Sequence, residues 1–333
     1  MNPTIILSGA PSAEELMCEL LADPHRARVI EVHLAPNFCG IRYSHAHMDG
    51  VDCNVFMDLM FAALFEVPAV GSADVQTRVR LPLVRAGLAL LMRGPAGALA
   101  AMKTMRSHVP QGNSVVCLPT DRRTNLEVFT VSATAARAYA KQVCEPGYRI
   151  SASMVVSGAL LQAIRSTLPA DLHLPILFPV DCRRYLRPDS RVPGNFAGPV
   201  IVGDASMPLS LAEMNDRVRD AAESGAAFVA FAKNVWRQYG RRQNQALPFP
   251  TTAACGVSIS NLMLMPVLSS LPWLPGHIPV AAAVNQTAHP VGIGINIDRV
   301  DDSVTVSLYD DAGLIDVCRV REIVETLIEP RSS

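Results

Sequence analysis

The sequence predicts an α/β (α+β) protein made of two domains, and three observations lead to this prediction. Segments with a helical spacing of apolar residues alternate with short β-like apolar runs along the chain. The chain has 333 residues, more than one hydrophobic core commonly serves. Half of the residues are hydrophobic and 18% are charged, a composition typical of a folded globular protein.

The first part of the chain contains two predicted helices and two predicted strands. Ser12 and Glu15 form a capping box, which indicates the start of a helix over residues 12–21. Two β-like segments follow, separated by a Pro-Asn dipeptide, and then apolar residues recur at helical spacing. The strands are predicted over 28–34 and 38–44, and the second helix over 51–65.

The rest of the chain continues the alternation of helices and strands. The spacing of apolar residues predicts helices over 81–105 (one or two, interrupted near 94–95), 133–143, 152–164 and 209–242, and strands over 176–180 and 257–265. A hairpin is predicted between 292–298 and 303–309, with its turn at Asp301 and Asp302. Asp316 is a good N-cap for a final helix.

Composition excludes several classes of protein. The net charge is −1 and only 5% of the residues are aromatic, so we expect no nucleic-acid partner. The eight cysteines form no CxxC pair, which indicates reduced thiols and a cytoplasmic location. Prolines repeatedly interrupt the long uncharged stretch at 243–297, so we interpret it as buried strands and turns and not as a membrane span.

One stretch of the chain is basic. Residues 75–120 contain no acidic residue but several arginines and lysines. A solvated basic helix face would explain this pattern. A surface that attracts an acidic ligand, a carrier protein or anionic lipid at the periphery of a membrane is the alternative.

The segment SHAHMDG at 44–50 gathers polar residues between a predicted strand and a predicted helix, where a rigid frame can present them. One interpretation is metal binding, because alternate histidines of an extended chain, His45 and His47, point the same way and can ligate zinc with Asp49. This pattern resembles the HxHxDH motif of metallo-β-lactamases. Gly50 stands where that motif has its last histidine, so we expect no metal.

The other interpretation of this segment is base catalysis. A histidine such as His45 is neutral at working pH and accepts a proton from an attacking hydroxyl or amine. The Asp49 carboxylate, four residues on, is placed to fix the ring or the turn. Gly50 lets the backbone bend and a substrate approach closely.

The segment also resembles the HxxxDG motif of the CoA-dependent acyltransferase superfamily. That superfamily includes chloramphenicol acetyltransferase, the condensation domains of peptide synthetases, and wax ester synthase/diacylglycerol acyltransferases. The histidine, aspartate and glycine of the motif match His45, Asp49 and Gly50.

Further segments agree with this superfamily in order and spacing. FPVDCRRYLRP at 178–188 resembles a strand that ends in Asp-x-Arg, with Arg183 as the matched arginine. GNF at 194–196 resembles the loop that follows. VSISNL at 257–262 resembles the Ser-Asn strand of the wax ester synthase branch, and 289–311 resembles the closing hairpin.

The resemblance implies two chloramphenicol-acetyltransferase-like sandwich halves with mixed sheets and a central tunnel. They would comprise residues 1–124, which carry HxxxDG, and 125–333. In the family the histidine is the general base, so His45 is expected to be catalytic. Asp49 is expected to form a structural ion pair with Arg183. Ser260 or Asn261 is a candidate for stabilising the oxyanion or lining the tunnel.

The implied function is transfer of an acyl group from a thioester to a hydroxyl or amine, in lipid or natural-product biosynthesis. The donor would be acyl-CoA or an acyl-phosphopantetheine carrier protein, as substrate and not as cofactor. The acceptor would be a small alcohol or amine. Two alternatives remain open: a non-catalytic acyltransferase-like binding protein and a metallo-β-lactamase-like metallohydrolase.

The chain departs from the family pattern in three ways. Ser44 stands where a second histidine is common, and Leu262 follows Asn261 where the wax ester branch has Pro-Gly-Pro. Only 44 residues precede His45, so the first half looks shortened. Because an uncovered sheet exposes apolar surface and unpaired backbone groups, we expect either a homodimer that buries this half or a widened cleft.

Overall fold

The structure is a computed structural model, and the described residues extend over most of the second half of the chain and over shorter segments of the first. They are residues 4–7, 15–17, 30–35, 38–43, 53, 56–57, 59–60, 77–92, 96–97, 100, 103, 115–117, 125–187, 190–192, 195–240, 252–254, 256–264, 280–284 and 292–329. No helix in this part of the chain is long and apolar enough to cross a bilayer.

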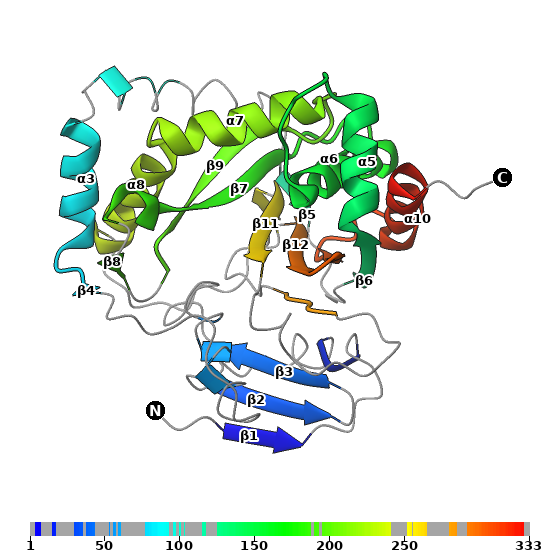
Figure 1. Cartoon of the computed structure of the whole chain (residues 1–333), viewed down its shortest axis with the longest axis horizontal. Coiled ribbons are helices and arrows are strands. Elements are labelled where there is room, and N and C mark those ends of the chain that lie inside the picture. The colour runs from blue at the N-terminus through cyan, green and yellow to red at the C-terminus, as the bar shows by residue number, and fades with distance from the viewer. Residues whose placement is uncertain are drawn as a thin grey trace.

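A mixed six-stranded sheet forms the centre of the protein (Figure 1). Its strand order is β6-β13-β12-β11-β7-β9, and β11 runs parallel to both of its neighbours while the other pairs are antiparallel. The strands are β6 (Asn125–Ser132), β7 (Pro175–Asp181), β9 (Ala197–Asp204), β11 (Gly256–Leu264), β12 (Gly292–Val300) and β13 (Ser303–Asp310). The predicted hairpin and the strands at 176–180 and 257–265 are therefore confirmed.

Five helices pack along one side of this sheet (Figure 1). They are α5 (Ala133–Val143), α6 (Ala152–Thr167), α7 (Leu211–Glu223), α8 (Ala226–Gly240) and α10 (Val317–Ile328). The most buried is α6, which contacts β11, β12 and three of the other helices. Asp316 caps α10 by accepting a hydrogen bond from the Arg319 amide, as predicted from the sequence.

The helical stretch predicted over 209–242 contains two helices, α7 and α8, and the break between them was not predicted. The chain leaves α7 at Ser224 and passes through Gly225, whose φ of +84° lies in the left-handed region. Glycine adopts this conformation without the steric cost that other residues meet, and it commonly ends helices. The strands β6 and β9 and the N-terminal strand β1 (Thr4–Leu7) were also not predicted.

A separate three-stranded sheet lies on the side of the molecule away from these helices (Figure 1). Strand β2 (Ile30–Ala35) pairs in parallel with β1 and antiparallel with β3 (Phe38–Tyr43). Both of the strands predicted in this region are confirmed. Leu16, within a short helical stretch, is buried beside Gly40 of β3.

Segments before residue 124 are joined to the central sheet's half of the protein. Strand β4 (Thr77–Arg78) pairs with β8 (Ser190–Arg191), and β5 (Val115–Cys117) pairs with β10 (Thr252–Ala254). Helix α3 (Pro82–Met92) buries Ala86 and Leu90 in the same hydrophobic core as α6 and α8. The boundary at 124 remains a prediction, and these contacts cross it.

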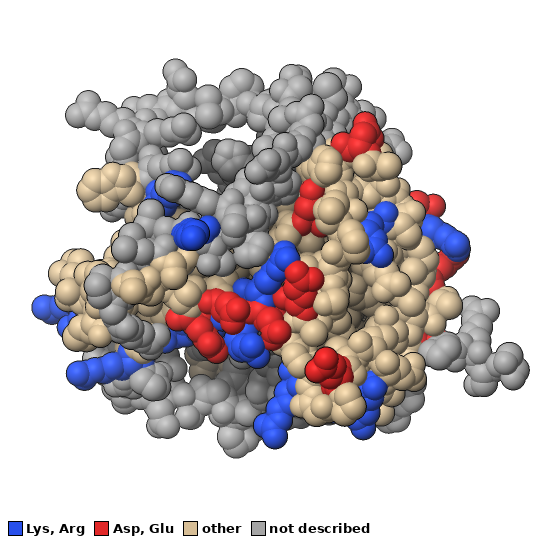
Figure 2. All heavy atoms as spheres, turned by 90° about the horizontal axis from the view of Figure 1, so that it is seen from above, with Lys and Arg blue, Asp and Glu red and all other residues tan. Residues whose placement is uncertain are grey.

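Charges of both signs are interspersed on the face that carries α7 (Figure 2). Much of this mixture consists of ion pairs within one helix, such as Arg217 with Glu213 and Arg219 with Asp216. Pairs of this kind contribute little to stability and leave no strong field of one sign.

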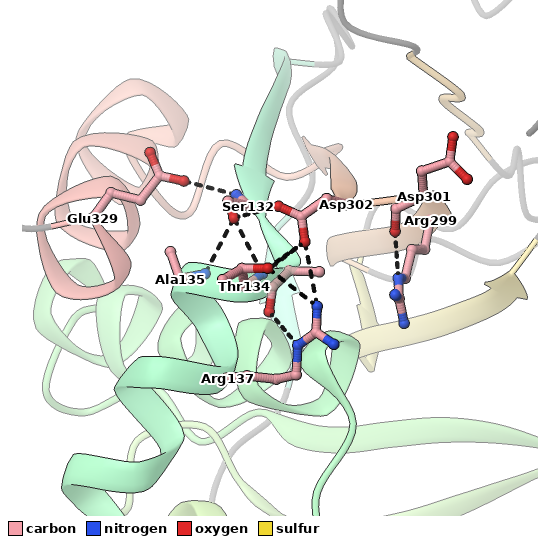
Figure 3. A network of polar contacts seen from close by, with 9 residues as sticks. Ser132, Thr134, Ala135, Arg137, Arg299, Asp301, Asp302 and Glu329 are labelled. Atoms are coloured by element: carbon pink, nitrogen blue, oxygen red, sulfur yellow. Dashed lines mark hydrogen bonds and ion pairs between the residues drawn. The ribbon is translucent and has the colours of Figure 1, made fainter.

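A polar network attaches the β12–β13 turn to the start of α5 (Figure 3). Asp302 accepts hydrogen bonds from the Ser132 hydroxyl at 2.6 Å and from the Thr134 amide and hydroxyl at 2.9 and 2.7 Å. Arg137 approaches the same carboxylate at 3.3 Å, and Glu329 of α10 accepts from the Ser132 amide at 2.7 Å. The hydrogen bonds from Ser132 and Thr134 lower the pKa of Asp302.

We predict that Asp302→Ala lowers the free energy of unfolding at neutral pH by about 1 kcal/mol, the usual cost of a lost acceptor at a helix start. Because the folded-state pKa is depressed, this contribution is present above the unfolded pKa of 3.8 and is lost as pH falls through the folded value. Denaturant unfolding at neutral and acidic pH measures the difference. Asp301→Asn is the matched control, since the backbone carbonyl of Asp301, and not its carboxylate, binds Arg299 and its φ of 52° suits asparagine. Equal losses in both variants would contradict the assignment.

Candidate active site

The predicted base and its motif, His45, Asp49 and Gly50, lie outside the described residues, as does His47. Their roles remain predictions. The described flanks agree with the expected strand-to-helix turn, because β3 ends at Tyr43 and Cys53 has a helical conformation.

Arg183 is held in a turn just after β7. It belongs to the short 3₁₀ helix η1 (Cys182–Tyr185), whose N-cap is Asp181. The guanidinium contacts Asp181 through Nη1 at 3.2 Å and donates to the Val192 carbonyl from Nε at 3.1 Å and Nη2 at 2.6 Å. Only 12% of the side chain is exposed, so Arg183 is a positioned, largely buried cation. Its pairing with Asp49 remains a prediction.

The two oxyanion candidates, Ser260 and Asn261, are neighbours on β11 and therefore face opposite sides of the sheet. Asn261 points toward the helices, since its Nδ2 donates to Ser153 Oγ of α6 at 2.7 Å. Ser260 is registered with Asn296 of β12 and shares its face. Only one of these two side chains can therefore line a cavity on a given face of the sheet.

The face that carries Ser260 is polar and largely buried. Asn296 donates to the Ala283 carbonyl at 2.7 Å, and Ser307, its partner on β13, accepts from the Ala283 amide at 3.2 Å. Residues 280–284 therefore lie on this face, opposite the helices. The other face of the same strands is apolar and packs under α6 and α10.

Sequence reasoning missed an acidic residue on this polar face. Asp298 alternates with Asn296 on β12 and is 1% exposed, and it is registered with Thr305 of β13. Neither carboxylate oxygen has a hydrogen-bond partner among the described residues. Burial raises the pKa of Asp298 to about 7. The alternation of Asn296 and Asp298 within an apolar strand was the available signal.

His173 forms an arrangement that resembles a catalytic triad but lacks its geometry. Its Nδ1 lies 2.7 Å from Asp204 Oδ2 and 3.1 Å from Ser206 Oγ, so both partners meet the same ring nitrogen. A triad needs the serine on one nitrogen and the carboxylate on the other. Asp204 also accepts from the Leu174 and Ser206 amides, which indicates a structural turn.

Residues that ligate metals do not gather in the part of the chain that the structure describes. No group of three histidine, cysteine, aspartate or glutamate side chains there is close enough to hold an ion. His45, His47 and Asp49 lie outside that part of the chain.

Comparison with solved structures identifies the fold. The chain is similar to the nonribosomal peptide synthetase FmoA3 (16% identity, TM-score 0.55, 99% of this chain), of which it spans 35%. It also matches the epimerization domain from the third module of tyrocidine synthetase B (14%, 0.53, 98% of this chain and 79% of that one). A third match is the first condensation domain of the CDA synthetase (11%, 0.53, 100% and 76%).

These likenesses show the fold of the condensation and epimerization domains. The predicted mixed α/β fold is thereby confirmed. No protein-family profile matches the chain, and no curated protein matches it in sequence.

We predict that Asp298 makes the stability of the protein fall as pH rises from about 4 to about 7. The group has a raised folded-state pKa, so its contribution is fully present below the unfolded value of 3.8 and is lost as pH rises through the folded value of about 7. Asp298→Asn is neutral throughout and removes this part of the slope. Denaturant midpoints across this pH range measure it, and an unchanged slope in the variant would contradict the burial of an unpaired carboxyl.

Proposed function

We propose that this chain, which has the fold of condensation domains, is an acyltransferase that uses His45 as its general base. It would transfer an acyl group from a CoA or carrier-protein thioester to a hydroxyl or amine. The observation that carries the proposal is an HxxxDG motif that begins two residues after the end of strand β3 in a chain with this fold. The motif supplies the base, and the fold favours acyl transfer over other uses of a histidine.

The proposed reaction begins with proton transfer. Nε2 of His45 accepts the proton of the acceptor hydroxyl or amine as its oxygen or nitrogen forms a bond to the thioester carbonyl carbon. The carbonyl π electrons move to oxygen and give a tetrahedral oxyanion. When the oxyanion collapses, the C–S bond breaks and the leaving thiolate takes the proton from the imidazolium. No cofactor is required, because the thioester itself is the activated species.

Ser260 is the stronger candidate for stabilising the oxyanion. Its side chain lies on the polar face opposite the helices, whereas the Asn261 amide already donates to Ser153 of α6. A hydroxyl donor fixed on a rigid strand costs little reorganisation when charge develops. Asn261 is better suited to position the strand against α6.

Asp49 is proposed to act as a structural anchor and not in proton transfer. Arg183 is fixed by the Val192 carbonyl and by Asp181, so it offers a stationary cation near the end of β7. A carboxylate paired with it would fix the turn that carries His45. Gly50 would then give the turn its bend.

The donor is proposed to be acyl-CoA or an acyl carrier protein, and both are acidic. The acid-free stretch at 75–120 favours such a partner, and its described members Arg80, Arg85 and Lys103 are exposed. The face around α7 carries charges of both signs, so it attracts an acidic partner less strongly. We therefore propose that the donor docks on the acid-free stretch and not on that face. We propose a cytoplasmic location for such a reaction.

We predict that His45→Ala lowers turnover by roughly 10²–10⁴, the usual contribution of a general base, and leaves the fold intact. Release of free thiol from a panel of acyl-CoAs, with and without alcohol and amine acceptors, measures the change. His47→Ala is the matched control and is expected to retain activity. Unchanged turnover in His45→Ala would refute the base, and binding of acyl-CoA without turnover in the wild type would favour the non-catalytic alternative.

We predict that Asp49 and Arg183 are energetically coupled. Removing one partner of a buried pair leaves an uncompensated charge and costs about 3–5 kcal/mol. A double-mutant cycle of Asp49→Ala and Arg183→Ala, followed by denaturant unfolding, separates the pair from the other contacts of Arg183. Arg184→Ala, at an exposed neighbouring position, serves as the control. Strictly additive losses would show that the two residues do not interact.

A further inference from the structure

The polar face of the central sheet contains a second group of side chains that the proposed reaction does not use. Asp298 and Thr305 face each other across β12 and β13, and Ser303 lies two residues from Thr305 on the same face. Both Asp298 oxygens and the two hydroxyl oxygens are buried, and none of the four has a hydrogen-bond partner in the part of the chain that the structure describes. Asp298 and Thr305 are each 1% exposed.

Such a group of oxygens is unfavourable unless something binds it. A buried polar atom without a partner costs about 1–3 kcal/mol, and an unpaired buried charge costs more. No basic side chain faces Asp298 among the described neighbours on this face, which include Thr130 of β6, Thr305, Ser303 and Asn296. The adjacent Arg299 is directed instead to the carbonyl of Asp301.

The chemistry of the four oxygens indicates the ligand. An ionised carboxylate only accepts hydrogen bonds, and a hydroxyl oxygen can also accept them. A primary ammonium has three N–H donors and a positive charge, so it can donate to three of the four oxygens and neutralise the carboxylate. Mg²⁺ and Ca²⁺ take six or more oxygen ligands, whereas this group offers four.

We propose that Asp298, Thr305 and Ser303 bind a primary ammonium group of the substrate. The inference rests on the proposed acyl transfer for the identity of the substrate. Asp298 lies two residues along β12 from Asn296, which is registered with Ser260, and this separation is about 7 Å. The ammonium is therefore on a part of the substrate that does not react, since an attacking amine must be unprotonated.

Binding of the ammonium should depend on pH with a definite sign. The carboxyl of Asp298 binds a cation only when it is ionised, and burial raises its pKa to about 7. Affinity therefore increases as pH rises from about 6 to about 8. The described side chains around it, Thr130, Thr305, Ser303 and Asn296, do not titrate in this range.

The first test measures binding and requires no catalysis. The ligands are n-butylammonium chloride and its uncharged isostere n-butanol at about pH 8, and the readout is the shift in the thermal unfolding midpoint. We expect apparent binding of butylammonium at least about tenfold tighter than of butanol in the wild type, and a ratio near one in Asp298→Asn. Asp220→Asn removes the same charge from exposed α7 and should keep the wild-type ratio.

Each other outcome overturns the proposal. Equal stabilisation by butanol, the same effect in Asp298→Asn, or equal stabilisation by sodium chloride at the same ionic strength would each exclude an ammonium site. Thr305→Val provides a second variant, to be used if Asp298→Asn alters the fold. It should also weaken butylammonium binding.

The second test extends the inference to turnover. With 1,4-diaminobutane and n-butylamine as acceptors, we expect the wild type to prefer the diamine by about tenfold in kcat/KM and Asp298→Asn to lose this preference. If neither acceptor is acylated, the proposed function fails while the binding measurement still decides the ammonium site. Equal use of the two acceptors by an active wild type would overturn the substrate assignment alone.

Discussion

The architecture depends on the backbone pairing of β12 between β11 and β13. This strand is buried on both faces, and its side chains alternate strictly between them. Ile293, Ile295 and Ile297 pack beneath the helices, whereas Asn296 and Asp298 point to the opposite face. One register thus provides both the hydrophobic core and the polar surface on which the chemistry is proposed. A slip of one residue would exchange the two faces.

The contacts around the hairpin turn hold this register in place. The β12–β13 turn is fixed by Asp302 to the first turn of α5, and Glu329 of α10 binds the Ser132 amide there. The start of α5, the β12–β13 turn and α10 therefore hold one another in position. Gly294 has a related packing role, because a Cβ at this position would overlap the ring of Tyr309 on the neighbouring strand.

The first part of the chain is positioned by pairing with later segments. Two short ladders, β4 with β8 and β5 with β10, join it to the half that contains the central sheet. Leu90 of α3 packs against Gly225, so the break between α7 and α8 also provides the space in which α3 sits. Gly225 therefore ends α7 and also leaves room for α3.

The sequence by itself determined the elements whose signals are local. The capping residue Asp316 lies at a helix start, and the Asp301-Asp302 turn closes a hairpin, because caps and turns depend on a few neighbouring residues. The mixed α/β fold was also predictable. The break at Gly225 also had a local signal, because glycine commonly ends helices, but the prediction considered only the spacing of apolar residues.

Only the tertiary structure decided which side chains share a face and which polar groups are buried. It placed Ser260 beside Asn296, Asn296 beside Ser307, and Asp298 beside Thr305 on neighbouring strands. These relations depend on the register between strands that are far apart in the sequence, and no window of neighbouring residues encodes that register. The burial of Asp298, and with it the raised pKa, likewise arises from chain packed on both sides of the sheet and not from its own segment.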